Sequence, residues 1–166
     1  MPALIFLLLA AQADLLSPHG EKAVVLLFVR SDCPVSNRYA PELERLYKNY
    51  SPQGVDFTLV YPEAGLTAEA MEKHRKEYGY TIPAVLDARH EYIARAKVVV
   101  TPEAAVFASG QLIYSGRIDD WYADIGKPRR KAARHDLEEV LAAVVAGKTV
   151  ALRQTKAIGC AIENPQ

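Results

Sequence analysis

The sequence has 166 residues, half of them hydrophobic, which is typical of one globular domain and excludes a disordered chain. Its 20 basic and 20 acidic side chains balance, so charge gives no reason to expect nucleic acid as a partner. No stretch reaches the roughly 20 apolar residues of a membrane-spanning helix, so we expect no membrane span.

The first 13 residues have the pattern of a short export signal. An apolar run precedes the small-x-small sequence AQA, after which cleavage would leave Asp14 as the first residue. No Lys or Arg precedes the run, so an N-terminal strand or a misplaced start codon are the alternatives. We expect a periplasmic or secreted protein with a signal segment at residues 1–13, a domain at residues 14–147 and a tail at residues 148–166.

Hydrophobic patterns predict alternating strands and helices in the first half of the chain. Residues 23–30 form a continuous apolar run with β-branched side chains, as in a strand buried on both faces. Pro34 suits the first turn of a following helix, which Pro52 and Gly54 end. The next expected elements are a strand at residues 55–62, a helix from Thr67 to about Tyr78 and an extended piece within residues 78–87.

The second half of the chain predicts one or two helical turns, a hairpin and a final helix. The turns fall within residues 91–98, and residues 103–118 read as two strands joined around a Ser-Gly pair. Helical spacing of apolar side chains predicts the final helix over residues 130–146. Parallel crossovers followed by a hairpin give a mixed sheet with helices on both faces.

Cys33 follows the buried strand and directly precedes the proline that starts the first helix. At a helix N-terminus, unpaired N–H groups and the macrodipole favour a thiolate, and a lowered thiol pKa makes cysteine nucleophilic. The Ser36 hydroxyl, one turn later, is placed to donate to the sulfur. The competing interpretation is a buried structural cysteine. Cysteine, proline and helix start together favour a redox-active and accessible sulfur.

The segment DCPVSNRYAPELERL resembles the active-site segment of thioredoxin-like redoxin proteins, the alkyl hydroperoxide reductase/thiol-specific antioxidant group and its extracytoplasmic thiol–disulfide relatives. The resemblance extends over residues 23–146. It implies a thioredoxin-like α/β fold with a mixed four- to five-stranded sheet and helices on both faces. It also implies a cis peptide bond at Thr101-Pro102 opposite Cys33, which would leave the Thr101 backbone open to pair with a substrate.

Two departures from the family pattern bear on the chemistry. The sequence Cys33-Pro34-Val35-Ser36 lacks the second cysteine of the family motif, so no local disulfide can form. Monothiol sites of this kind typically form mixed disulfides with glutathione or a protein. Peroxidases of the group carry threonine where this chain has Arg30, which weakens the resemblance to a peroxide site.

Cys160 is the other cysteine of the chain, and it lies in the tail. An extended segment from Lys148 to Cys160 spans up to ~40 Å, enough to return from the end of the last helix to Cys33. Cys160 would then resolve a sulfenic acid or a mixed disulfide, form a permanent disulfide with Cys33, or remain free to face another protein. An intramolecular bond ranks slightly above a free thiol.

We therefore expect a thiol–disulfide oxidoreductase or thiol peroxidase acting on protein thiols or disulfides, a small thiol or a peroxide. The expected catalytic residues are Cys33, Ser36 and Cys160, and the expected substrate contacts are Pro34, Thr101, Pro102 and Trp121. No cofactor is expected, and no histidine lies at metal-ligand spacing from another. The alternative is a non-catalytic redoxin module with a structural disulfide that binds a partner protein or a metal.

Overall fold

The computed structural model describes residues 14–16 and 19–163, so the predicted signal segment at residues 1–13 lies outside the described residues. Among the residues described, no helix is long and apolar enough to span a membrane. The elements in chain order are β1 (Ala23–Phe28), α1 (Pro34–Tyr50), the 3-10 helix η1 (Ser51–Gln53), β2 (Val55–Tyr61), α2 (Ala68–Glu77), β3 (Ala84–Leu86), α3 (Glu91–Ala96), β4 (Val100–Thr101), β5 (Glu103–Ala108), β6 (Gln111–Gly116), β7 (Tyr122–Asp124), β8 (Lys127–Pro128), α4 (Asp136–Val145), β9 (Arg153–Gln154) and β10 (Cys160–Ala161).

Six strands form one mixed sheet in the order β3-β2-β1-β5-β6-β9. β1, β2 and β3 run parallel, because α1 and α2 provide the crossovers between them, whereas β5 pairs antiparallel with both β1 and β6. The expected α/β fold with a mixed sheet is confirmed. The expected count of four to five strands is too low, because the tail adds β9 as a parallel partner of β6.

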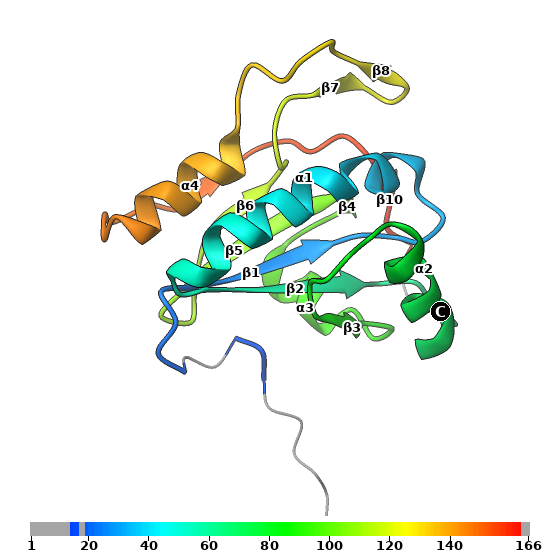
Figure 1. The fold of residues 1–166 in the computed structure, drawn as a ribbon, viewed down its shortest axis with the longest axis horizontal. Coiled ribbons are helices and arrows are strands. Elements are labelled where there is room, and N and C mark those ends of the chain that lie inside the picture. Colours follow the sequence, from blue (N-terminus) through cyan, green and yellow to red (C-terminus); the bar gives the residue numbers. More distant parts are fainter. Residues whose placement is uncertain (1–13, 17–18, 164–166) are drawn as a thin grey trace, which may run out of the picture.

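The sheet separates two apolar cores, and β1 contributes to both. Val25 and Leu27 pack into the core under α1 and α4, while Leu26 and Phe28 pack into the core on the α3 side. Figure 1 shows α1 and α4 across one face of the sheet and α3 on the other. Because both faces of β1 are buried, nearly every residue of the strand is apolar. Burial of each side chain of this size stabilises the folded state by about 1.5–3 kcal/mol.

The first helix begins and ends as its sequence predicts. Pro34 occupies the first turn of α1, where its missing N–H is not needed. The helix passes into η1 after Tyr50, and Gly54 ends that turn with a φ of 88°, a left-handed conformation that favours glycine. This arrangement presents the N-terminus of a long helix at the carboxyl end of β1.

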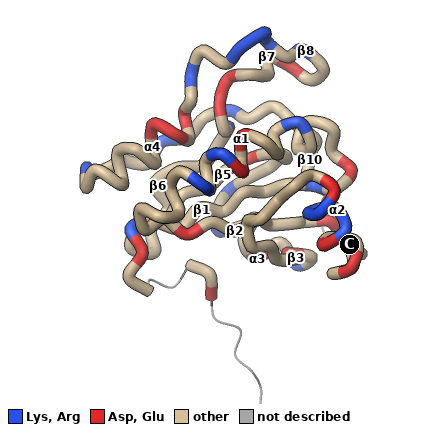
Figure 2. The backbone as a smooth tube through the Cα atoms, viewed as in Figure 1, with Lys and Arg blue, Asp and Glu red and all other residues tan. Residues whose placement is uncertain are grey.

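The final helix starts at Asp136 rather than near residue 130, so the predicted start is wrong. The Asp120 carboxylate accepts hydrogen bonds from the N–H groups of Ala133 (2.7 Å) and Arg134 (2.9 Å), which keeps this segment out of the helix. Before it, β7 and β8 form a hairpin that stands away from the sheet in Figure 1. Figure 2 shows basic residues after β8, with acidic and basic residues interspersed elsewhere.

Candidate active site

The structure joins Cys33 and Cys160 by a disulfide bond across a sequence separation of 127. Their Cα atoms lie 6.1 Å apart, within the usual range for disulfides. The intramolecular pairing expected from the sequence is therefore confirmed, and Cys160 is not free in this state. The bond brings the end of the tail to the start of α1.

Cys33 is the N-cap residue of α1, and its backbone there is extended, with φ −92° and ψ 110°. Its sulfur accepts a hydrogen bond from the Ser36 N–H at 3.5 Å. The predicted contact from the Ser36 hydroxyl is replaced by this backbone contact, and the hydroxyl oxygen instead accepts from the Arg30 N–H at 3.5 Å. The helix N-terminus thus supplies the polar environment that favours negative charge on the sulfur.

Thr101 and Pro102 lie directly against this sulfur. Their peptide bond is cis, as predicted. The Thr101 carbonyl oxygen is 3.2 Å from the Cys33 Sγ, and both residues are fully buried. Cys33, Cys160, Thr101 and Pro102, four of the predicted site residues, are therefore adjacent in the structure.

The tail covers the active-site sulfur. β10 pairs antiparallel with β4, so Cys160 lies opposite Thr101, and the Arg30 guanidinium donates to the Ala161 carbonyl oxygen at 3.0 Å. Cys33 is 0% exposed, whereas Cys160 is partly exposed. The expectation of an accessible Cys33 is wrong for the disulfide state, because its sulfur is bonded to Cys160 and the residue packs within the core beside Val35 and Tyr39.

The tail is also fixed upstream of the disulfide. β9 extends the sheet beside β6, and the Thr155 hydroxyl is 2.7 Å from the Tyr114 hydroxyl and accepts from the Arg117 N–H at 3.1 Å. The tail runs so close to β6 that a Cβ on Gly116 would lie 2.2 Å from the Thr155 Oγ1. These contacts do not depend on the sulfur–sulfur bond.

The buried carboxylate of Glu103 holds the backbone at the start of β4 by hydrogen bonds. Glu103 is 5% exposed and accepts hydrogen bonds from the N–H groups of Val99 (2.9 Å) and Val100 (3.3 Å). Burial raises the pKa of Glu103, and the two hydrogen bonds oppose that shift. Glu103 thereby fixes the backbone against which the tail pairs, a role for which the sequence offered no signal.

Trp121 and Tyr122, in the connection after β6, take different places. Trp121 packs edge-on against Tyr39 with ring centroids 5.4 Å apart, whereas Tyr122 lines a narrow crevice together with Tyr39, Pro102 and Ile158. The Tyr39 hydroxyl donates to the buried Asp119. Pro34 is exposed at the helix start. Substrate contact by Trp121 and Pro34 stays a prediction, whereas Tyr39 and Tyr122 are the aromatic residues that line the crevice with Pro102.

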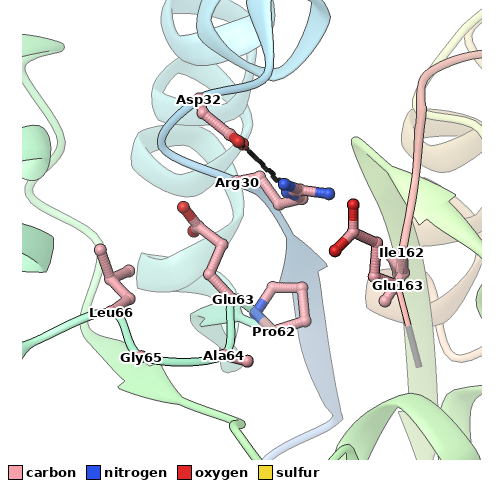
Figure 3. A pocket seen from close by; sticks show the side chains of 9 residues that line it. All are labelled: Arg30, Asp32, Pro62, Glu63, Ala64, Gly65, Leu66, Ile162 and Glu163. Carbon is pink, nitrogen blue, oxygen red and sulfur yellow. Dashed lines mark hydrogen bonds and ion pairs between the residues drawn. The ribbon is translucent and has the colours of Figure 1, made fainter. Parts of the chain in front are cut away.

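A cavity of about 300 Å³ lies between the end of the tail, Arg30 and the loop at residues 62–66. Figure 3 shows Arg30 and Asp32 on one side of the cavity, the loop at residues 62–66 on another, and Ile162 and Glu163 of the tail on a third. Arg30 is fixed there by two hydrogen bonds to Asp32, at 2.9 and 2.8 Å. From the sequence, Arg30 was noted as the residue that replaces a peroxidase threonine, and its contact with the tail was not predicted.

A histidine network ties the start of α1 to its neighbours. His74 is 6% exposed, with Nδ1 2.8 Å from the Tyr61 hydroxyl and Nε2 2.9 Å from the Asn37 Oδ1. Because the Asn37 oxygen can only accept, Nε2 carries the proton and Nδ1 accepts from the Tyr61 hydroxyl. The neutral imidazole therefore satisfies both neighbours.

This network makes stability depend on pH. Burial lowers the pKa of His74 from 6.5, against an opposing effect of Glu77, so the unfolded chain takes up a proton more readily than the folded one. The free energy of unfolding should fall as the pH drops below 6.5. Urea unfolding midpoints at pH 7.5 and 5.5 measure this effect, and His74→Gln, which keeps a donor toward Asn37, should flatten it. An equal pH dependence in the variant would contradict the assignment.

Among the described residues, Glu42, His135 and Glu138 have ligand atoms within 4.8 Å of one another. The Arg45 guanidinium already bridges the two carboxylates, with Nη2 2.7 Å from each. The positive charge of Arg45 already neutralises the two carboxylates, so we assign no metal to this cluster. Glu42 is distant in sequence from His135 and Glu138, so local ligand spacing did not reveal the cluster.

Comparison with known proteins gives a family for most of the chain. A family model described as thioredoxin-like matches residues 20–112. No curated protein matches the sequence. The peroxidase group named by the sequence resemblance is not among these findings.

Solved structures are similar over most of the chain. An uncharacterized conserved protein from Geobacillus kaustophilus is 27% identical with a TM-score of 0.70, covering 85% of this chain and 76% of that one. A hypothetical protein from Sinorhizobium meliloti 1021 is 24% identical with a TM-score of 0.75, covering 87% of this chain and 80% of that one. A secreted Mycobacterium tuberculosis disulfide oxidoreductase is 18% identical with a TM-score of 0.49, covering 76% of this chain and 83% of that one.

Proposed function

The chain belongs to the thioredoxin-like family, and we propose that it is a thiol–disulfide oxidoreductase whose redox pair is Cys33 and Cys160. One observation carries the proposal: the disulfide joins a sulfur at a helix N-terminus, beside Thr101-Pro102, to a cysteine on a separate tail strand. The family motif has a second cysteine where this chain has Ser36, and here Cys160 of the tail takes its place as the partner of Cys33.

The forward reaction starts from the reduced protein. The Cys33 thiolate, favoured by the helix N-terminus, attacks a partner disulfide, forms a mixed disulfide and releases the partner's other sulfur as a thiolate. The Cys160 thiolate then attacks the Cys33 Sγ, which forms the observed disulfide and releases the partner. Two electrons pass from the two protein thiols to the partner disulfide.

The return reaction uses the opposite sulfur. In the disulfide state Cys160 is the partly exposed member of the pair and Cys33 is buried. A thiol reductant therefore attacks the Cys160 Sγ, and Cys33 leaves as the thiolate that the helix favours, which makes it the better leaving group. A second thiolate from the reductant then releases Cys160.

Two cysteine variants test the proposal with 5,5′-dithiobis(2-nitrobenzoate) as the model disulfide. The Cys160→Ser protein should react rapidly and stop as a one-to-one mixed disulfide on Cys33, seen by mass spectrometry. The Cys33→Ser protein should lose the rapid phase, because the remaining thiol lacks the helix N-terminus. The opposite order of reactivity would overturn the assignment.

Dithiothreitol separates catalysis from the alternative of a structural disulfide. We expect millimolar dithiothreitol to reduce the folded wild-type protein without added denaturant, because Cys160 is accessible. Reduction that requires unfolding would instead support a non-catalytic module that binds a partner protein or metal. Hydrogen peroxide in the same assay tests thiol peroxidase activity, which we consider less supported because Arg30 is engaged by Asp32 and the tail.

We further propose an extracytoplasmic location, with residues 1–13 as export signal, residues 14–147 as the domain and residues 148–166 as a redox tail. An oxidising compartment is where a disulfide such as this persists. The partners we propose are protein thiols and disulfides, which fit an active site that pairs with an extended strand.

A further inference from the structure

We propose that the reduced active site selects an extended partner segment in which glycine directly precedes the reacting cysteine, laid antiparallel to β4 where the tail now lies. This inference rests on the proposed function and specifies its substrate class. The tail itself is the template, because its Cys160 is bonded to Cys33 and its strand pairs with Val100 and Thr101.

The glycine requirement comes from Gly159. A Cβ built on it would lie 2.0 Å from the Thr101 carbonyl oxygen, 2.6 Å from its carbon and 3.1 Å from the Pro102 nitrogen. All three are backbone atoms of buried residues, so no flexible side chain can move aside. Gly159 is not among the residues with positive φ, so space alone demands glycine here.

The same carbonyl group couples this fit to the chemistry. The Thr101 oxygen that would clash with a Cβ is also 3.2 Å from the Cys33 Sγ. A segment with a side chain before its cysteine must lift away from β4, and lifting also moves its sulfur away from Cys33. Misplacement on this scale slows a reaction that needs aligned atoms. A partner with glycine before its cysteine should therefore react faster with Cys33 than a partner with any other residue there.

The remaining tail contacts are ones that many extended segments can supply. Arg30 donates to the main-chain oxygen of Ala161, and the Val99 oxygen accepts from the Ile162 N–H at 3.1 Å. Ile158 reaches the crevice beside Pro102, which favours an apolar residue at that place. The recognised pattern is an apolar residue, then glycine, then cysteine, on a segment free to become a strand.

A pair of peptides of identical composition tests this selection on the reduced Cys160→Ser protein. The first is acetyl-AIGCAI, the sequence of residues 157–162, and the second is acetyl-AIACGI, each carrying thionitrobenzoate on its cysteine. Attack by Cys33 forms the bond to the peptide sulfur and breaks the bond to thionitrobenzoate, which leaves as a coloured thiolate. We expect the first peptide to react at least about tenfold faster.

The glutathione–thionitrobenzoate disulfide distinguishes the two ways to fail. Rapid reaction with it but equal rates for the peptides would overturn the glycine selection and leave the proposed function standing. No rapid reaction with any of the three would overturn the proposed function itself. A faster reaction of the alanine-before-cysteine peptide would also contradict the selection.

A second test uses the intact chain and the redox equilibrium of its own disulfide. Gly159→Ala should lower the ratio of oxidised to reduced protein in a glutathione buffer by about tenfold or more, because the tail fits less closely. Ala161→Gly, the matched control at an exposed position on the other side of Cys160, should change that ratio less than Gly159→Ala does. Equal effects of the two variants would contradict the steric argument.

Discussion

Cys160→Ser is expected to lower the free energy of unfolding by about 5 kcal/mol relative to the oxidised wild-type protein. The disulfide closes a loop across a sequence separation of 127, and constraint of so long a loop removes much conformational freedom from the unfolded chain. Against a typical total of about 5–15 kcal/mol, this is a large share.

Denaturant unfolding of the oxidised and reduced proteins measures this difference. Wild-type protein in dithiothreitol should match Cys160→Ser, since both lack the loop constraint. Cys33→Ser should unfold at a similar midpoint, although its buried site also loses a sulfur. A loss of less than about 1 kcal/mol in the reduced wild-type protein would contradict the loop argument.

Asp136→Asn is expected to lower the free energy of unfolding by about 2–3 kcal/mol, less than the 3–5 kcal/mol typical of a broken buried pair. Asp136 is fully buried at the start of α4 and binds Arg117, with Oδ2 2.7 Å from Nε, together with Arg153 and Arg134. The arginines remain 28–58% exposed, so water offsets part of the loss. Arg153 extends from β9, so the substitution should also weaken the attachment of the tail.

The same contacts make Asp136 sensitive to acid. Burial alone would raise the pKa of Asp136, but the hydrogen bond from Arg117 and the charges of the three arginines outweigh it and lower the pKa below 3.8. The folded state therefore binds fewer protons, and its stabilisation is complete above that value and lost as the pH falls through the lowered pKa. Asp136→Asn should remove this acid-dependent loss.

Glu139→Gln is the matched control for Asp136→Asn. Glu139 lies on the same helix and also contacts Arg153, at 2.9 Å, but it is 52% exposed. An exposed pair of this kind contributes about 0–1 kcal/mol. Guanidinium unfolding at pH 7 and pH 3 compares the three proteins, and equal effects of the two substitutions would contradict the burial argument.

Elements with local signals were predicted well from the sequence. The apolar run of β1, the proline at the start of α1 and the Thr67 cap of α2 each depend on side chains within a few residues, and the structure has all three. The start of α4 could not be predicted in this way, because it depends on hydrogen bonds from Ala133 and Arg134 to the distant Asp120.

The candidate site also contains some features that local sequence predicts and others that depend on distant parts of the chain. Cys33 was identified from its place between a buried strand and a helix start, and Thr101 and Pro102 from the family resemblance; the structure has them adjacent. The burial of Cys33 and the close approach of Gly159 depend on the path of a distant strand, which no local pattern reveals. The glycine before the tail cysteine was the available signal, and it gains meaning only beside Thr101.

In the proposed reaction, the attachment of the tail at Thr155 would limit how long a partner stays bound. When the disulfide opens, the few residues from Thr155 to Cys160 restrict the freed thiol to within ~17 Å of its anchor. So short a tether gives an effective concentration in the millimolar range. If the proposed reaction holds, the tethered Cys160 thiol releases a captured partner, and the lifetime of the mixed disulfide is then set by this chain rather than by its reductant.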